Sequence, residues 1–180
     1  MIIGNAVTLL PFDEKYIDTV HGWINQPDVR IGTGSEGPVS TPEHRRWYEQ
    51  VMSDPQIRMF IIGRGVGADA LPVGVIALRR IEHRARSAEY SIYVADQASR
   101  RMGVALEATI LILRFGFMRL GLHRIYLRVM QCNVPAVRLY EKLGFYLEGV
   151  AREDTLLDGR MESSACYSML SREFEQKFGH

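Results

Sequence analysis

The stretch SRRMGVALEA, residues 99–108, places two arginines and a glycine directly before an apolar helix pattern. The apolar positions in and after it are separated by four, three, four and three residues: Val104, Ala108, Leu111, Phe115 and Met118. This period predicts a helix that begins near residue 104. A helix N-terminus presents unpaired backbone N–H groups and the positive end of the helix dipole, which suit an anion. Gly103 has no Cβ, so the backbone can approach a phosphate closely; an ordinary strand-to-helix turn is the alternative.

Three strand-like segments precede this helix, at residues 57–63, 71–82 and 87–95. They are dense in Ile, Val, Phe and Tyr, and turn residues separate them, so we expect antiparallel hairpins. Successive side chains of a strand point to opposite faces of the sheet. The third segment therefore carries two sets of residues: Glu89, Ser91 and Tyr93 on one face, and Tyr90, Ile92 and Val94 on the other.

The second half of the chain continues with alternating strand and helix patterns. Three strands are expected there, at residues 123–130, 145–150 and 162–171. Asn133 is a typical N-cap for a helix that tolerates Pro135 in its first turn and ends at Gly144. Asp158 and Gly159 are expected near the turn between the last two strands.

The N-terminal part predicts one strand, two helices and a long loop. Residues 6–10 predict a strand, and residues 13–25 predict a helix. Residues 25–40 are rich in Gly, Pro and Ser and predict a loop, which is often functional at that length in a compact domain. A second helix is expected from Thr41, with its hydroxyl as N-cap and Pro42 at the first helical position.

Together these elements, about seven strands and about four helices, predict a single α/β domain over residues 1–180 with a mixed, mostly antiparallel central sheet. The apolar fraction of 47% and the charged fraction of 24% are those of a globular protein. No apolar run approaches the roughly 18 residues of a membrane span, and the first ten residues lack the basic region of a signal peptide. A cytoplasmic protein without a membrane partner is expected.

The charge balance and the cysteines argue against two further classes of partner. The 22 Lys and Arg residues nearly balance the 21 Asp and Glu residues, whereas nucleic acids are usually bound by a basic face. Four arginines lie close together in a segment that we interpret as a solvated hairpin end: Arg79, Arg80, Arg84 and Arg86. Cys132 and Cys166 do not have the spacing of metal ligands. We expect no nucleic-acid partner and no metal site.

Two motifs together resemble the GNAT superfamily of N-acetyltransferases. The segment RRMGVA, residues 100–105, fits that family's (Gln/Arg)-x-x-Gly-x-(Gly/Ala) acetyl-CoA loop. The segment NVPAVRLYEKLGF, residues 133–145, fits its Asn-x-x-Ala-x-x-Leu-Tyr-x-x-x-Gly-Phe helix. The motifs occur in the family's order with a strand between them, and the surrounding strands also match. The resemblance therefore covers nearly the whole chain and implies the GNAT fold.

The resemblance implies acetyl-CoA as co-substrate, bound where two central strands splay apart. The loop residues expected to bind its diphosphate are Arg100, Arg101, Met102, Gly103, Val104 and Ala105. The strand residues expected to flank its pantetheine arm are Ile92, Tyr93 and Val94 on one strand and Leu127–Met130 on the other. Asn133 would contact the arm. Arg101 and Met102 depart from the family pattern, since many relatives have further small residues at these positions.

The implied reaction is direct attack of a neutral amine on the thioester carbonyl. Tyr140 would protonate the departing thiolate, although an aromatic residue on an apolar helix face is otherwise a core residue. Glu89 is our candidate base, acting directly or through water. The alternative for Glu89 is a cross-strand ion pair with one of three arginines: Arg84, Arg86 or Arg128.

The acceptor side is expected on the first two helices, around residues 23–30 and 40–51. These segments resemble the family branch that holds ribosomal-protein N-terminal, polyamine and amino-sugar-nucleotide acetyltransferases, the last group above all. The residues expected to bind the acceptor are Trp23, Arg30, Trp47 and Tyr48. Their rings would stack on a base or sugar, whereas tryptophans at helix spacing are otherwise core residues. A polyamine would favour an acidic pocket, but three candidates form no cluster: Asp28, Glu36 and Glu43.

Our leading hypothesis is an acetyl-CoA-dependent N-acetyltransferase that acts on the primary amine of a small molecule such as an amino-sugar nucleotide. The alternative acceptors are the N-terminus of a (ribosomal) protein, a polyamine and an aminoglycoside. A non-catalytic alternative is an acyl-CoA-binding regulatory module, but such modules commonly lose catalytic groups, whereas Tyr140 and Glu89 are both present. Exposed strand edges near the C-terminus would permit a homodimer.

Overall fold

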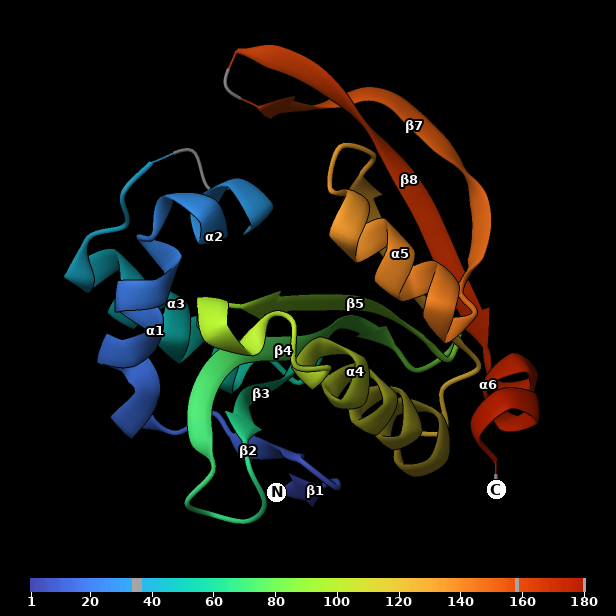
Figure 1. The fold of residues 1–180 in the computed structure, drawn as a ribbon, viewed down its shortest axis with the longest axis horizontal. Helices are drawn as coiled ribbons and strands as arrows, with labels where there is room; N and C mark the ends of the chain where they lie inside the picture. The colour runs from blue at the N-terminus through green and yellow to red at the C-terminus, as the bar shows by residue number, and fades with distance from the viewer. Residues whose placement is uncertain (34–36, 158, 180) are drawn as a thin grey trace.

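The computed structural model describes residues 1–33, 37–157 and 159–179, and its strands form one open sheet (Figure 1). The sheet has the order β1-β2-β3-β4-β5-β6-β8-β7. Its strands are β1 (Ile2–Ile3), β2 (Val7–Pro11), β3 (Arg58–Arg64), β4 (Leu71–Glu82), β5 (Ser87–Val94), β6 (Arg124–Met130), β7 (Tyr146–Leu157) and β8 (Arg160–Leu170). Neighbouring strands are antiparallel except β5 and β6, which pair in parallel. The expected α/β fold with a mostly antiparallel sheet is therefore confirmed.

Helices cover both faces of the sheet. They are α1 (Ile17–Ile24), α2 (Pro27–Thr33), α3 (Thr41–Ser53), α4 (Val104–Arg114), α5 (Val134–Leu143) and α6 (Ser171–Phe178). The alternation of β4 divides the core: Ile76 and Leu78 pack in a cluster with α4, α5 and α6, whereas Val75 and Ala77 pack in a second cluster with α1 and α3. None of the helices in the described part of the chain is long and apolar enough to cross a membrane.

The structure corrects the expected loop at residues 25–40, because residues 27–33 form α2. Pro27 stands at its first position, where a helix needs no N–H donor, and Val29 is buried against the domain. This packing outweighs the poor helix propensity of Gly32. Glu36, one of the acidic candidates, lies outside the described residues.

Three further details differ from expectation. The N-cap of α3 is Ser40 rather than Thr41, since the backbone N–H of Ser40 donates to Glu43 Oε2 at 2.9 Å in a capping box. The short strand β1 and the helix α6 were not expected, so the described residues form eight strands and six helices. Asp158, expected in the turn between β7 and β8, lies outside the described residues.

The parallel strands β5 and β6 separate part of the way along their length. They pair only from Ser87 to Glu89 on β5 and from Arg124 to Tyr126 on β6. Beyond this point β5 continues to pair with β4 as far as Val94, and β6 continues to pair with β8. The two strands therefore diverge, and the centre of the sheet opens.

Candidate active site

A cleft of about 810 Å³ occupies the opening between β5 and β6. Its walls come from five parts of the fold: the second half of β5, the end of β6, the start of α4, the inner face of α5, and α2. The hairpin of β7 and β8, which arches above α5 in Figure 1, adds Asp154, Thr155 and Ser164. The cleft thus brings together segments that are far apart in the sequence.

The start of α4 supplies backbone donors to this cleft. Gly103 is the N-cap in the left-handed region with φ 77°, and no atom lies within 4 Å of where its Cβ would be. The first helical hydrogen bond runs from Glu107 N–H to the Gly103 carbonyl at 3.1 Å. The N–H groups of the three residues between them therefore have no acceptor within the helix. Gly103 and Ala105 line the cleft, so this turn fits the diphosphate of a cofactor.

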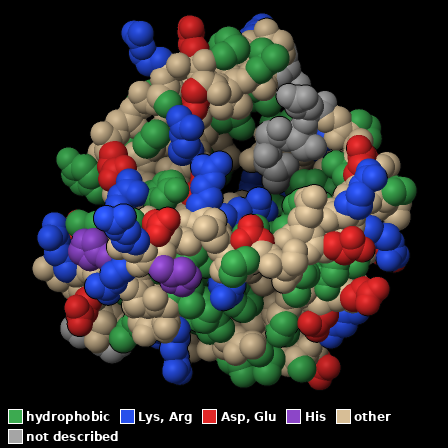
Figure 2. Space-filling view, turned by 180° about the vertical axis from the view of Figure 1, so that it is seen from behind, with side chains coloured by type: hydrophobic (Ala, Val, Ile, Leu, Met, Phe, Trp, Pro, Cys, Tyr) green, Lys and Arg blue, Asp and Glu red, His purple; other side chains and the backbone are tan. Residues whose placement is uncertain are grey.

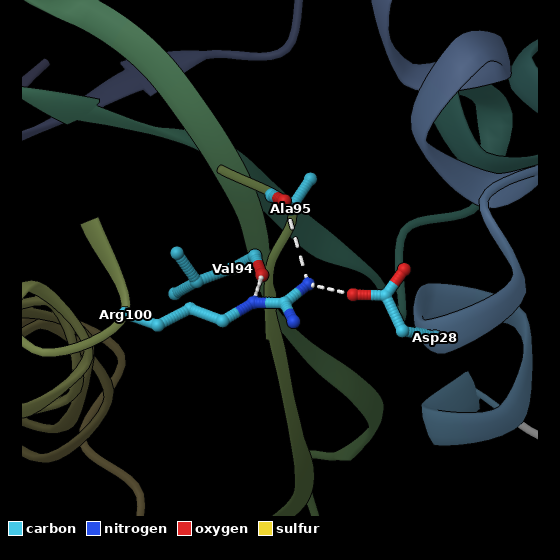
Figure 3. Close-up of polar contacts among 4 residues, drawn as sticks. All are labelled: Asp28, Val94, Ala95 and Arg100. Carbon is cyan, nitrogen blue, oxygen red and sulfur yellow. Dashed lines mark hydrogen bonds and ion pairs between the residues drawn. The ribbon is translucent and has the colours of Figure 1, made fainter. Parts of the chain in front are cut away.

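The side chain of Arg100 is oriented differently from our expectation (Figure 3). Its Nε donates to the Val94 carbonyl at 2.8 Å, and its Nη2 lies 3.4 Å from the Ala95 carbonyl and 2.5 Å from Asp28 Oδ2. The hydrogen bond from Arg100 holds the pKa of the Asp28 carboxyl below its usual range. Arg100 lines the cleft, but its guanidinium joins the end of β5 to α2 rather than pointing at a phosphate.

The two residues after Arg100 are exposed, and neither lines the cleft. The sulfur of Met102 accepts a hydrogen bond from Arg64 Nη1 at 3.3 Å, a contact that brings a cation from β3 to the loop. Arg101 is exposed on the same turn. Val104 is buried in the core, so its backbone but not its side chain is available to a ligand.

Helix α5 forms the opposite wall and begins as expected. Asn133 is its N-cap, and its Oδ1 accepts a hydrogen bond from the Ala136 N–H at 3.3 Å. The helix ends at Gly144, which adopts φ 89°. Asn133, Ala136 and Tyr140 all line the cleft. The amide of Asn133 therefore both caps the helix and faces the expected position of the cofactor arm.

Tyr140 lines the cleft and is surrounded by aromatic residues. Its residue is 6% exposed, and its ring centroid lies 6.0 Å from Tyr90, 5.7 Å from Phe145 and 6.3 Å from Tyr167. Burial raises the pKa of Tyr140 to about 12, so the hydroxyl keeps its proton at neutral pH. The hydroxyl has no hydrogen-bond partner among the described residues. It is therefore available to donate a hydrogen bond to a group bound in the cleft.

A buried hydrogen-bond chain behind Tyr140 was not found from the sequence. Tyr90 Oη lies 2.7 Å from Thr109 Oγ1, which donates to the Ala105 carbonyl at 2.6 Å. The chain joins β5 to the first turn of α4, next to Gly103. Its only sequence signal is a threonine on the buried face of an apolar helix.

Glu89 lies where β5 and β6 are still paired, before the cleft opens. Its Oε2 is 3.5 Å from Arg80 Nε, and Arg79 is its cross-strand neighbour on β4. The ion-pair alternative thus has a partner, although it is Arg80 and not one of the arginines we named. Two residues farther along the same face, Ser91 lines the cleft and Glu89 does not. A role as base would require water to connect its carboxylate to the amine.

The aromatic residues assigned to the acceptor pack together in the second core cluster. Phe12 contacts Trp47 and Tyr48 with ring-centroid distances of 5.9 Å and 5.2 Å, and Trp23 packs against the same cluster. Neither these rings nor Arg30, which is half-buried on α2, line the cleft. Their packing corresponds to the core alternative, so we do not carry the stacking role forward.

Among the described charged residues of the cleft, the acidic ones form ion pairs and two of the basic ones do not. Asp154 is paired with Arg128 Nη2 at 2.9 Å, and Asp28 is paired with Arg100. Arg138 and Lys142 on α5 also line the cleft, and neither has an ion-pair partner within the described residues. On the back of the molecule the cleft is visible as a hollow with Lys and Arg side chains beside it (Figure 2). The unpaired charge is positive and suits an anionic cofactor.

The described part of the chain has no group of three His, Cys, Asp or Glu residues that could hold a metal ion. The charged cleft residues to which the sequence analysis gave no role are Arg138, Lys142 and Asp154. Asp154 is held by an ion pair with Arg128 on another strand, which no local pattern in the sequence reveals.

Known proteins are similar to this chain in sequence and in fold. The sequence profile of the acetyltransferase (GNAT) domain matches residues 6–146. Spermidine N(1)-acetyltransferase of Escherichia coli (strain K12) is 28% identical over 161 residues, covering 89% of this chain and 84% of that protein. The uncharacterized prophage-derived N-acetyltransferase YokL of Bacillus subtilis (strain 168) is 30% identical, covering 79% and 77%. The structure of Vibrio cholerae spermidine N-acetyltransferase in complex with CoA and spermine superposes with a TM-score of 0.88 at 26% identity, covering 95% of this chain and 99% of that one.

Proposed function

Since the chain belongs to the GNAT acetyltransferase family and is an acetyl-CoA-dependent N-acetyltransferase, we propose that it acetylates the primary amine of a small molecule in the cleft between β5 and β6. The observation that carries this proposal is the meeting of two expected features in one cleft. Gly103, at the open backbone turn, and Tyr140, whose hydroxyl stays protonated, both line it.

The residues present fit acetyl-CoA. The backbone N–H groups at the start of α4 would bind its diphosphate, and the unpaired charges of Arg138 and Lys142 would attract its phosphates. The backbone of Ile92, Tyr93 and Val94 does not pair with β6, so this part of β5 is free to flank the pantetheine arm. When bound, acetyl-CoA supplies an acetyl group activated as a thioester.

In the proposed reaction Tyr140 acts as the acid. Its hydroxyl would hydrogen-bond to the thioester sulfur and stabilise the thiolate through that hydrogen bond as the C–S bond breaks, and the free thiol would take its proton from solvent. The backbone of β5 beyond Glu89 would position the acyl group, while Glu89 would draw the proton from the attacking amine through water. The buried aromatic residues around Tyr140 exclude solvent and fix its ring.

For the acceptor we propose a small amine that is not a polycation, with an amino-sugar nucleotide as the first candidate. Both carboxylates that the described residues contribute to the cleft are already held by arginines. A molecule such as spermidine carries several positive charges and would need unpaired carboxylates to offset their desolvation. The phosphates of a sugar nucleotide, in contrast, would meet the Lys and Arg side chains beside the hollow (Figure 2).

A polyamine is the second candidate, because proteins named as spermidine acetyltransferases are similar over most of the chain. The two classes are separated by measuring CoA release with a UDP-linked amino sugar, spermidine, an aminoglycoside and an alanine-starting peptide. We expect the highest kcat/KM with the sugar nucleotide. A higher kcat/KM with spermidine would overturn our acceptor assignment and leave the transfer reaction in place.

We also propose a homodimer and a cytoplasmic location. Strand β7 is at the edge of the sheet, and several of its apolar residues, together with one on β8, are exposed: Tyr146, Leu147, Val150, Leu156 and Met161. An exposed apolar edge strand favours pairing with a second chain.

A further inference from the structure

Helix α2 is a short element that forms part of the cleft wall. Val29 and Gly32 face the cleft from it. A seven-residue helix is not stable in isolation, so tertiary contacts must set its position. The contacts that hold α2 therefore determine the shape of this side of the cleft.

One of these contacts leads directly to the loop that we assign to the cofactor. Asp28 on α2 lies 2.5 Å from Nη2 of Arg100, three residues before Gly103. The Nε of the same guanidinium donates to the Val94 carbonyl at 2.8 Å, which fixes its plane (Figure 3). A planar guanidinium held at two points cannot follow Asp28 without moving the loop. The position of α2 and the position of the loop are thus linked through one side chain.

A second polar clamp holds the other end of the same segment. Asn25, at the C-terminus of α1, accepts a hydrogen bond from the Val39 N–H at 2.8 Å and donates to the Val39 carbonyl at 3.0 Å. His21 Nε2 lies 2.7 Å from that carbonyl. These hydrogen bonds hold Val39 against the C-terminal end of α1. The ion pair of Asp28 instead ties the intervening helix to the cofactor side.

We propose that Asp28 is a positioning residue that transmits cofactor binding from the Gly103 loop to α2. The inference rests on the proposed function, because it takes the loop as the cofactor site. Binding of CoA immobilises the loop and with it Arg100, and the ion pair then holds α2 against the cleft. The acceptor wall is ordered when the cofactor is present, so the amine binds better to the CoA complex than to the free protein.

The strength of the coupling between α2 and the loop depends on how far solvent reaches the ion pair of Arg100 and Asp28. The side chains of Arg100 and Asp28 are 36% and 39% exposed, so solvent screens the pair. The factor expected of one such contact is about fivefold. The lowered pKa of Asp28 keeps its carboxylate ionised at neutral pH, where the experiment is made.

The test is amide hydrogen exchange with and without saturating CoA, in the wild type, Asp28→Asn and Asp28→Glu. The readout is the ratio of exchange rates without and with CoA, measured separately for residues 27–33 and 104–108. In the wild type we expect CoA to slow both segments, α2 by about fivefold. Asp28→Asn should reduce the α2 ratio to near one and leave the 104–108 ratio unchanged. Asp28→Glu should recover part of the α2 ratio.

This ratio of exchange rates distinguishes a residue that transmits cofactor binding to α2 from one that only stabilises α2. A merely structural contact would speed α2 exchange equally with and without CoA, and the ratio would not change. Asp18→Asn is the matched control, because Asp18 on α1 pairs with Arg45 at 3.9 Å, away from the cleft. This variant should behave as the wild type.

Two results would overturn the inference while sparing the cofactor site. In one, CoA protects residues 104–108 but not α2 in the wild type. In the other, α2 is protected equally in the wild type and in Asp28→Asn. If CoA protects neither segment of the wild type, the proposed cofactor site is wrong, and the inference is overturned together with it.

Discussion

Replacement of Tyr140 by Phe removes one oxygen atom and little else. The ring contacts with Tyr90, Phe145 and Tyr167 do not involve that oxygen. Because the hydroxyl has no hydrogen-bond partner among the described residues, its loss breaks no internal bond. We expect the free energy of unfolding to change by less than about 0.5 kcal/mol.

The effect on turnover is expected to be larger and can be bounded from the acidity of Tyr140. General acids contribute roughly a hundredfold to ten-thousandfold. With a pKa of about 12, Tyr140 is a weaker acid than an ordinary thiol, whose pKa is about 8.5. Complete proton transfer to the thiolate is therefore uphill, and the hydroxyl acts mainly through a hydrogen bond in the transition state. We expect kcat to fall about a hundredfold, which corresponds to about 2.7 kcal/mol.

The assay is the rate of CoA release with a thiol reagent at saturating amine, together with the acetyl-CoA Kd from calorimetry. Tyr167→Phe is the matched control, since it removes the same atom from a ring 6.3 Å away that does not line the cleft. The Kd should stay within about twofold in both variants. An unchanged kcat in Tyr140→Phe, or an equal loss in Tyr167→Phe, would refute the acid role.

The raised pKa of Tyr140 also predicts a pH dependence of stability. Its hydroxyl is harder to ionise in the folded chain than in the unfolded chain, so the folded state binds more protons between about pH 10 and pH 12. The free energy of unfolding should therefore fall as the pH rises through this window. Urea unfolding should show a shallower fall in Tyr140→Phe, and an identical fall would contradict the assigned burial.

Three further changes test other parts of the structure. Gly103→Val should raise the acetyl-CoA Kd at least about tenfold, because it places a branched side chain at φ 77° beside the loop donors. Gly67→Val, at φ 89° away from the cleft, should leave the Kd unchanged. Equal acetyl-CoA affinities of the two variants would contradict the loop assignment. Thr109→Val leaves the hydroxyl of Tyr90 without its buried partner and should lower the free energy of unfolding by about 1–3 kcal/mol in urea titrations; no loss would show that this bond contributes nothing. Leu156→Lys places a charge on the exposed edge strand and should convert a homodimer to monomer in light scattering, whereas a wild type that is already monomeric would refute the dimer.

Local patterns in the sequence were sufficient for the elements that build the cofactor side. The apolar period after Gly103 predicted α4, and Asn133 and Gly144 predicted both ends of α5. These signals depend on backbone geometry and on one buried helix face, which neighbouring residues determine. Helix α2 was missed because its proline and glycine are typical of loops, and its burial through Val29 is a tertiary effect.

The candidate site shows the same division. The cleft-facing positions of Gly103 and Tyr140 followed from motifs, whereas the partner of Arg100 did not, because Asp28 is distant in the sequence and belongs to another layer. Trp47 had two interpretations that its helix spacing could not separate. Its packing against Phe12 depends on how α3 sits on the sheet, which no local pattern encodes.

The central claim is that the cleft beside Gly103 binds acetyl-CoA. A calorimetric titration of the wild-type protein with acetyl-CoA tests it most directly. We predict saturable binding of one acetyl-CoA per chain, with a Kd in the range of about 1 μM to 1 mM that is usual for enzyme substrates. The absence of saturable binding up to millimolar acetyl-CoA would contradict the account, since it would mean that the turn before α4 is only a turn.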